Sequence, residues 1–291
     1  MQFRFFPLSI LLTANALTAC ATNPPAETPV ESGSNVATTA ATEPAPPSAD
    51  PAPRALASEA SPDAKAAIHA AIAADDREAD DRALDEQRKP EEMLNFFGVT
   101  PGMRVAELAA GRGYTTELLA RAVGPSGKVY GQNSKFILER FAGGPWSERL
   151  KKPALQNVER IDTEFEAPFP ASVKDLDRVF IVLFYHDTVW FGTDRAAMNR
   201  AVFAALKPGG VYAIVDHSAR AGDGTDVAKS LHRIEESVVQ AEVLAAGFTL
   251  AKSADFLREP SDARDWNASP SAAGDKRGHS DRFVLEFVKP L

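Results

Sequence analysis

The sequence predicts an α/β fold, in which a mostly parallel sheet of seven strands is covered by helices on both faces. Short runs rich in Val, Ile, Leu and Phe alternate with helical patterns from about residue 90 onward, and this alternation is typical of parallel sheets. One run, Asp177–Tyr185 (DRVFIVLFY), is apolar almost throughout, as expected of a strand that is buried on both faces.

Helical patterns open the folded part. The stretch 64–88 is rich in Ala, Asp, Glu and Arg and predicts one or two surface helices, and Pro90 begins a short helix that closes at Gly98. Further helices are expected at 114–123, 136–141, 194–206 and 233–246, with an interruption at Gly143-Gly144-Pro145.

The seven expected strands are 104–108, 128–131, 157–161, 177–185, 211–215, 249–253 and 283–288. We expect the last two to pair antiparallel, as a hairpin at one edge of the sheet. The polar loop 258–281 between them has no regular helical pattern, and loops of this length are usually lids, binding segments or disordered.

The first 62 residues differ in composition from the rest. No Phe, Trp or Tyr occurs between Phe6 and Phe96, and nine of the 21 prolines lie within residues 24–62. Such a stretch cannot bury enough apolar surface to offset its ordering entropy. We therefore expect a disordered Ala/Pro/Ser/Thr-rich tether at 21–62 and a folded domain at 63–291.

Residues 1–20 have the features of an export signal, with Arg4 followed by an apolar segment and small residues. Their ending, Leu17-Thr18-Ala19-Cys20, resembles the lipobox of bacterial lipoproteins. The resemblance implies a lipidated Cys20 that anchors the chain to a membrane, and Ala21 after it favours the outer membrane, with the domain facing the periplasm. The alternative is an ordinary secretory signal whose cysteine is incidental.

Composition excludes several other classes of protein. A single Cys rules out an internal disulfide framework and a cysteine-rich metal site. A net charge of -8 without a basic run argues against nucleic acid as a partner. We therefore expect a small-molecule substrate.

The segment Glu107-Leu108-Ala109-Ala110-Gly111-Arg112-Gly113 ends the first strand and opens a helix. It resembles motif I of class I S-adenosylmethionine-dependent methyltransferases. Three later segments agree in order: Gly127-Lys128-Val129-Tyr130-Gly131, Leu206-Lys207-Pro208-Gly209-Gly210 and Ala245-Ala246-Gly247-Phe248. The resemblance covers roughly residues 90–291 and implies a Rossmann-like methyltransferase fold with S-adenosylmethionine as cofactor.

Within that class the chain is similar to exported predicted methyltransferases of unassigned substrate. The segments that carry this similarity are Tyr185-His186-Asp187, Val215-Asp216-His217-Ser218, His232-Arg233-Ile234-Glu235 and Asp255-Phe256-Leu257-Arg258. Location is a difficulty for this function, because S-adenosylmethionine is not known to be supplied outside the cytoplasm.

A glycine-rich turn before a helix lets backbone N–H groups approach a ligand carboxylate. The resemblance implies that this carboxylate belongs to the methionine part of the cofactor. It also implies a ribose-binding acid at the end of the second strand, where this chain has the neutral Asn133, so we expect weakened ribose binding. The expected cofactor-binding residues are Glu107, Ala109, Gly111, Gly113, Tyr114, Asn133 and Asp162.

Four polar residues follow two neighbouring strands of the expected sheet: His186 and Asp187 after the fourth, Asp216 and His217 after the fifth. Ligands of open α/β sheets bind outside the carboxyl ends of the strands. We therefore expect these four residues to be catalytic, with His186 or His217 as the base that deprotonates a methyl acceptor and the aspartates as orienting groups. His232 could face the same crevice, and polar caps of neighbouring loops are the simpler interpretation.

We assign no metal ligands, but a divalent metal at Asp187, Asp216 and His217 is an alternative. The placement is similar to catechol-type O-methyltransferases, although histidine is an unusual ligand for magnesium. Tyr185, Trp190 and Phe191 are expected either to line an aromatic substrate pocket or to pack in the core. Arg233 is expected at a solvated helix start, or as a ligand for a substrate acid.

The sequence thus predicts a methyltransferase that acts on an O or N nucleophile of a small molecule. Two alternatives stay open. One is a non-enzymatic lipoprotein that binds a nucleoside or another small molecule, and the other is a metal-assisted enzyme that uses the histidine and aspartate residues.

Overall fold

The computed structural model describes residues 61–291. The expected signal peptide, lipidated Cys20 and all but the end of the tether lie outside the described residues. Within 61–291, no helix combines the length and the apolar character needed to cross a membrane.

The described residues contain one seven-stranded sheet, with the order β3-β2-β1-β4-β5-β7-β6. Neighbouring strands from β3 through β5 pair parallel, whereas β7 pairs antiparallel with both β5 and β6. The strands are β1 (Arg104–Leu108), β2 (Lys128–Asn133), β3 (Val158–Asp162), β4 (Leu176–Val182), β5 (Leu206–His217), β6 (Thr249–Ala254) and β7 (Arg282–Val288). The predicted fold class is confirmed, including the antiparallel pair at one edge.

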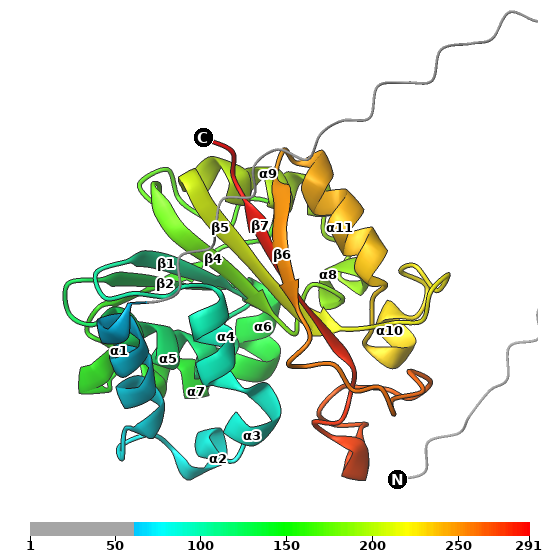
Figure 1. The fold of residues 1–291 in the computed structure, drawn as a ribbon, viewed down its shortest axis with the longest axis horizontal. Helices are drawn as coiled ribbons and strands as arrows, with labels where there is room; N and C mark the ends of the chain where they lie inside the picture. The colour runs from blue at the N-terminus through cyan, green and yellow to red at the C-terminus, as the bar shows by residue number, and fades with distance from the viewer. Residues whose placement is uncertain (1–60) are drawn as a thin grey trace, which may run out of the picture. The chain divides into compact units, whose positions relative to one another are not determined.

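Helices cover both faces of this sheet, and Figure 1 shows α9 and α11 on one side and α1, α4 and α5 on the other. The helices before β4 are α1 (Pro62–Ala73), α2 (Ala79–Arg82), α3 (Asp85–Arg88), α4 (Pro90–Phe96), α5 (Tyr114–Val123), α6 (Lys135–Ile137) and α7 (Gly143–Arg149). Those after it are α8 (Asp187–Trp190), α9 (Arg195–Ala205), α10 (Ala228–Leu231) and α11 (Glu236–Ala245).

Successive strand residues face opposite sides of the sheet, so the chain forms two cores. Ala106 and Leu108 of β1 belong to the core with α9 and α11, whereas Val105 belongs to the core with α1, α4 and α5. A strand in the centre of the sheet therefore needs apolar side chains on both of its faces, which is why β4 lies in a largely apolar stretch of the sequence.

The structure differs from the predicted elements at several places. The stretch 64–88 holds three helices, α1 to α3, instead of one or two. Gly143, Gly144 and Pro145 form the first turn of α7 instead of interrupting a helix, because proline is tolerated at the start of a helix. β4 ends at Val182, since Leu183 is left-handed with φ 56°. β5 begins already at Leu206, and α11 begins only at Glu236.

Candidate functional site

The carboxyl ends of the central strands bring the candidate residues to one edge of the sheet. Leu108 at the end of β1 is aligned with Ile181 of β4, and Val182 is aligned with Val215 of β5. The loop after β1, the residues that follow β4 and the last residues of β5 therefore lie next to one another, as parallel topology requires.

The loop between β1 and α5 is left-handed at Ala109, Gly111 and Gly113, with φ 52°, 57° and 88°. A side chain at Gly111 would meet only the Ala109 carbonyl, at 3.8 Å, so the space over Gly111 is open. A side chain at Gly113 would lie 2.4 Å from the Trp146 ring. Gly113 is thus required by packing, whereas Gly111 leaves room for a ligand to approach the backbone.

The end of β2 holds this loop in place. Asn133 Oδ1 accepts a hydrogen bond from Gly111 N–H at 2.8 Å, and Asn133 Nδ2 donates to Gly111 C=O at 3.2 Å. Gln132 Oε1 accepts from Ala109 N–H at 3.1 Å. Asn133 is fully buried, so its amide positions the loop and is not presented to solvent as the free ribose ligand that the sequence suggests.

Glu107 lies beneath the loop and is 3% exposed. The Thr116 hydroxyl donates a hydrogen bond to its carboxyl group. Burial raises the pKa of Glu107 to about 7, against the lowering effect of the threonine hydrogen bonds. This side chain supports the first turn of α5.

Tyr114 is covered by the segment before β1. Its hydroxyl donates to Asp85 at 2.7 Å, and the Arg88 guanidinium lies 4.5 Å from its ring centroid. Asp162 of β3, in contrast, is exposed. It is the residue of β3 aligned with Asn133 of β2, and its carboxylate accepts a hydrogen bond from Arg160 Nε at 2.7 Å. Of the predicted cofactor-binding residues, Glu107, Tyr114 and Asn133 thus contact other parts of the chain, whereas Asp162 has an exposed carboxylate.

A histidine and aspartate cluster follows β4. His186 Nδ1 lies 2.7 Å from Asp216 Oδ1, and the other carboxylate oxygen accepts from the His186 backbone N–H at 2.7 Å. His186 Nε2 lies 3.1 Å from Asp187 Oδ1 and 3.2 Å from His232 Nδ1. His232 ends α10, which packs against α8. We call His186, Asp187, His232 and Asp216 the histidine cluster.

The charges in the histidine cluster are mutually dependent. Burial alone would lower the pKa of His186, but the carboxylates of Asp216 and Asp187 outweigh it and raise the pKa to about 10. Burial would raise the pKa of Asp187, yet hydrogen bonds from His186 and His232 hold it well below its usual range. The site therefore favours a positive charge between two carboxylates.

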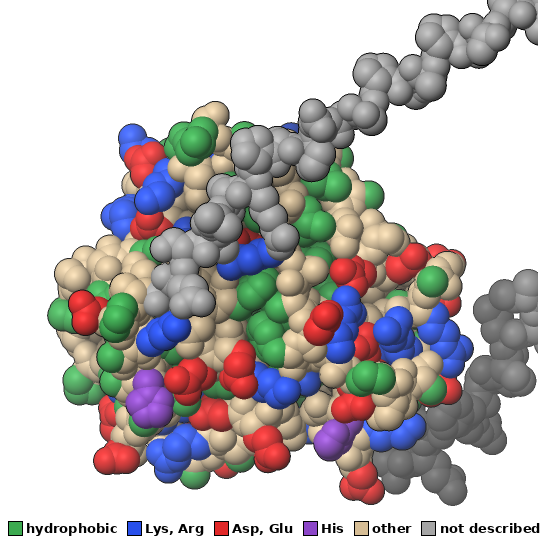
Figure 2. Space-filling view, viewed as in Figure 1, with side chains coloured by type: hydrophobic (Ala, Val, Ile, Leu, Met, Phe, Trp, Pro, Cys, Tyr) green, Lys and Arg blue, Asp and Glu red, His purple; other side chains and the backbone are tan. Residues whose placement is uncertain are grey.

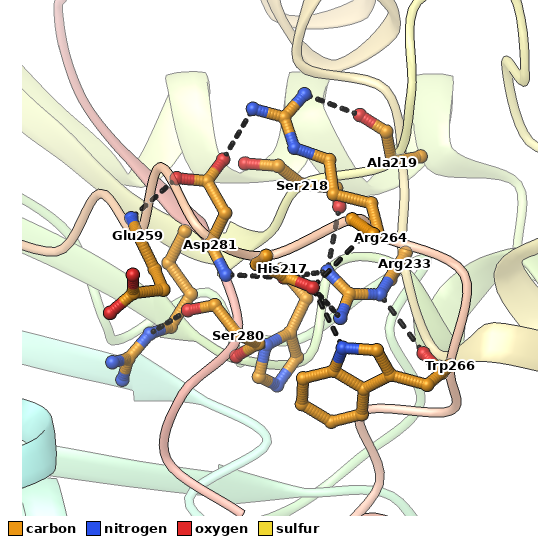
Figure 3. A network of polar contacts seen from close by, with 12 residues as sticks. His217, Ser218, Ala219, Arg233, Glu259, Arg264, Trp266, Ser280 and Asp281 are labelled. Carbon is orange, nitrogen blue, oxygen red and sulfur yellow. Dashed lines mark hydrogen bonds and ion pairs between the residues drawn. The ribbon is translucent and has the colours of Figure 1, made fainter. Parts of the chain in front are cut away.

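His217 takes part in a second network of polar contacts, shown in Figure 3. Its Nδ1 lies 2.7 Å from the Ser280 hydroxyl, and burial lowers its pKa well below the usual range. The structure thus brings His186, Asp187 and Asp216 together and adds His232. His217 adjoins this group, because its ring centroid lies 5.6 Å from that of His186 and its backbone N–H donates to Asp216 Oδ1 at 2.8 Å, while its Nδ1 contacts the loop before β7.

That loop is fixed by buried ion pairs. Arg233 and Asp262 are both fully buried side chains 2.8 Å apart, and Arg233 also donates to the Trp266 carbonyl at 3.2 Å. Asp281 pairs with Arg264 at 2.8 Å and accepts from the Glu259 backbone N–H at 2.8 Å (Figure 3). The prediction that Arg233 is solvated was wrong, because Asp262 of this loop pairs with its guanidinium in the interior of the protein.

Aromatic side chains lie beside the histidine cluster. Trp190 Nε1 donates to Asp187 Oδ1 at 2.7 Å, and the Trp190 ring lies 4.0 Å from that of Phe191. Phe136 contacts both rings and is 41% exposed, next to Phe141 at 57%. Tyr185 is fully buried and therefore belongs to the core. We call Phe136, Phe141, Trp190 and Phe191 the aromatic patch.

A small cavity lies between the start of α5 and the ends of β4 and β5, lined in part by Tyr114, Thr115, Leu183 and Arg282. A larger groove lies at the opposite end of α5, around Ala120 and Pro125. That groove lacks the candidate residues and is not the site.

Solved structures agree with the observed topology. A S-adenosylmethionine-dependent methyltransferase from Aquifex aeolicus superposes with a TM-score of 0.52 and 20% identity, covering 71% of this chain and 93% of its own. The chain has a Rossmann-like methyltransferase fold.

Curated relatives match part of this methyltransferase fold, although no protein-family model matches the chain. The ubiquinone/menaquinone biosynthesis C-methyltransferase UbiE of Cronobacter sakazakii is 32% identical over 131 residues, which cover 43% of this chain and 47% of that protein. UbiE of Pasteurella multocida is 32% identical over 127 residues, covering 43% and 44%. The chain thus matches less than half the length of these relatives.

Sequence reasoning missed one feature of the site and left another open. In a motif whose usual acid binds ribose, nothing indicated that Asn133 would instead hold Gly111 in place. His232 was expected as a residue that could face the same crevice, but its contact with His186 depends on a left-handed backbone at the C-cap of α10, with φ 50°, which the sequence does not indicate.

Proposed function

We propose that the protein transfers a methyl group from S-adenosylmethionine to an O or N nucleophile of a small molecule. The observation that supports this most is the open backbone at Gly111, at the same sheet edge as the histidine cluster. When bound, the cofactor supplies an electrophilic methyl group on a sulfonium sulfur. The protein's part in such a displacement is to align the reactants and to manage one proton.

The residues fit the methionine end of this cofactor better than the ribose end. The backbone is open at Gly111, just before a ten-residue helix, where a carboxylate is favoured. At the ribose position Asn133 is neutral and already holds Gly111. Asp162 is the exposed carboxylate next to it, so we propose that Asp162 contributes to the ribose or adenine contacts.

The histidine cluster would orient the acceptor. Asp216 fixes the ring plane of His186, and Asp187 receives hydrogen bonds from His186, His232 and Trp190. A hydroxyl or amine that binds beside His232, whose side chain is 23% exposed, would lie next to an imidazole that could take its proton and a carboxylate that could orient it. The aromatic patch next to Asp187 favours an acceptor with an aromatic or apolar body.

We further propose that the protein is exported and anchored through Cys20 to a membrane, facing the periplasm. The UbiE relatives are named C-methyltransferases, so a carbon acceptor is the alternative to be included among test substrates. A non-enzymatic binding protein is the second candidate, supported by the buried amide where an acid would hold the ribose.

Calorimetry on the purified full chain tests the proposal. Titrations with S-adenosylmethionine and S-adenosylhomocysteine should both give saturable heat, and Gly111→Ala should weaken both. Gly124→Ala is the matched control, because Gly124 is also left-handed (φ 65°) with open space around it but lies at the other end of α5. Absence of heat with either compound at millimolar concentration would refute the methyltransferase function, and binding without methyl transfer to any acceptor would favour the binding protein.

A further inference from the structure

Three potential metal-ligand atoms meet in the histidine cluster. His186 Nε2 and Asp187 Oδ1 are 3.1 Å apart, Asp187 Oδ1 and His232 Nδ1 are 3.0 Å apart, and the two imidazole nitrogens are 3.2 Å apart. We propose that His186, Asp187 and His232 bind a divalent transition-metal ion of the zinc class through these three atoms.

The distances between the three atoms suit such an ion. Zn²⁺ binds imidazole nitrogen and carboxylate oxygen at about 2.0–2.2 Å in tetrahedral geometry, so two ligand atoms lie about 3.3–3.5 Å apart. The observed triangle needs to expand by only a few tenths of an ångström. Two imidazoles and one carboxylate suit zinc and its neighbours, whereas magnesium prefers oxygen ligands alone.

The surroundings of the ligands support the assignment. Metal-binding histidines typically donate their second ring N–H to a carboxylate, which fixes the tautomer and points the other nitrogen at the metal. Asp216 Oδ1 lies 2.7 Å from His186 Nδ1 and is placed to accept that hydrogen bond. Trp190 Nε1 likewise donates to Asp187 Oδ1 at 2.7 Å, and this holds the carboxylate in place.

The backbone of His232 is a second, independent observation. It is left-handed (φ 50°, ψ 54°) at the C-cap of α10, a position that Gly or Asn normally takes. Such strain in a non-glycine residue is typical of sites where function fixes the side chain. His232 is also the most exposed of the three ligands. An acceptor could therefore reach the metal site from the side on which His232 lies.

A cation also suits the charges around the histidine cluster. Asp216 and Asp187 both lie against the His186 imidazole, and the facing nitrogens of His186 and His232 are 3.2 Å apart. A metal ion would bind a lone pair on each of these two nitrogens and offset the charge of the carboxylates. The ligand set is thus not the Asp187, Asp216 and His217 of the sequence interpretation, because Asp216 binds His186 and His217 binds Ser280.

This inference deepens the proposed function. A metal ion would hold the acceptor oxygen or nitrogen at the open position and lower its pKa. Metal binding itself requires no cofactor, so it can be measured separately from methyl transfer.

The test uses the full chain after dialysis against a chelator, with Zn²⁺ as the calorimetric probe and Co²⁺ as the spectroscopic one. We expect one ion per chain and the visible absorption of tetrahedral Co²⁺. His232→Asn removes a ligand while keeping a residue that tolerates the left-handed backbone. It should weaken metal binding more than about 100-fold. Asp216→Asn changes an outer partner of a ligand and should weaken metal binding only by roughly 10–100-fold.

Controls separate this site from adventitious binding. His69→Gln removes an exposed histidine of α1 and should leave affinity and stoichiometry unchanged. No saturable binding in the wild type, or equal affinity in wild type and a folded His232→Asn variant, would overturn the metal site. A chain that binds zinc but neither S-adenosylmethionine nor S-adenosylhomocysteine would refute only the methyltransferase function. A chain that binds these two compounds but not zinc would refute only the metal site.

Discussion

Asn133→Asp separates two roles for the residue at the end of β2. If this residue binds ribose, restoring the usual acid should tighten S-adenosylmethionine binding. If its role is to hold the Gly111 loop, the same substitution should damage the loop. The structure favours the second outcome, because both amide atoms of Asn133 contact Gly111.

The magnitude follows from those two contacts. Aspartate keeps an oxygen that can accept from Gly111 N–H, but it replaces the Nδ2 donor by an oxygen about 3.2 Å from the Gly111 carbonyl. Leaving a buried carbonyl unpaired costs about 1–3 kcal/mol, and the new charge would lie at a fully buried position. We expect the free energy of unfolding to fall by about 2 kcal/mol, which lowers Tm by roughly 4–8 °C for a domain of this size.

The assay is urea unfolding at pH 7 together with calorimetric titration of S-adenosylmethionine. Asp162→Asn is the matched control for stability, since it changes one charge on the adjacent strand at an exposed position and should shift stability by no more than about 0.5 kcal/mol. A variant Asn133→Asp with unchanged stability and tighter cofactor binding would refute the loop-holding role.

Three further predictions concern buried groups. Arg233→Met should lower the free energy of unfolding by about 3–5 kcal/mol in urea titrations, because Asp262 would be left as an unpaired buried charge; the double variant with Asp262→Leu should recover most of that loss. Glu107 keeps its proton in the folded state up to pH about 7 but in the unfolded chain only up to about 4.5. The free energy of unfolding should therefore fall as the pH rises from about 4.5 through 7, by up to about 3 kcal/mol. Glu107→Gln should make this fall smaller, as measured by denaturant unfolding at a series of pH values. Gly113→Ala should lower Tm more than Gly111→Ala, since both strain a left-handed residue but only the first drives a methyl group into the Trp146 ring; equal Tm losses would contradict the packing role of Gly113.

The fold was predictable where the pattern was set by burial. β4 is apolar because it lies in the middle of a sheet that is covered on both faces, and α5 follows the glycine turn directly. Element ends were less predictable, because they depend on single backbone conformations. The left-handed backbone of Leu183 ends β4 three residues before Tyr185, and the apolar sequence around Leu183 gives no indication of this conformation.

The site was predictable to the extent that topology fixed it. Residues after parallel neighbouring strands must share an edge, which places His186 and Asp187 near Asp216. Partners that come from loops were less predictable. Nothing in the sequence indicates Ser280 as the partner of His217 or Asp262 as the partner of Arg233, and His232 was expected only to face the crevice, without His186 as its partner. These contacts depend on how the segments 218–235 and 255–281 pack together, and that packing has no periodic signal in the sequence.

The polar loop before β7 is therefore part of how the site is built. His232 must hold a strained backbone conformation, and the next residue, Arg233, is fixed by Asp262 of that loop and donates to the Ser218 carbonyl just beyond β5. Leu231, on the other side, accepts a backbone hydrogen bond from Ala268 of the same loop. The loop thus anchors the chain immediately before and after His232, so weakening the Arg233–Asp262 pair should loosen the histidine cluster even though neither residue belongs to it.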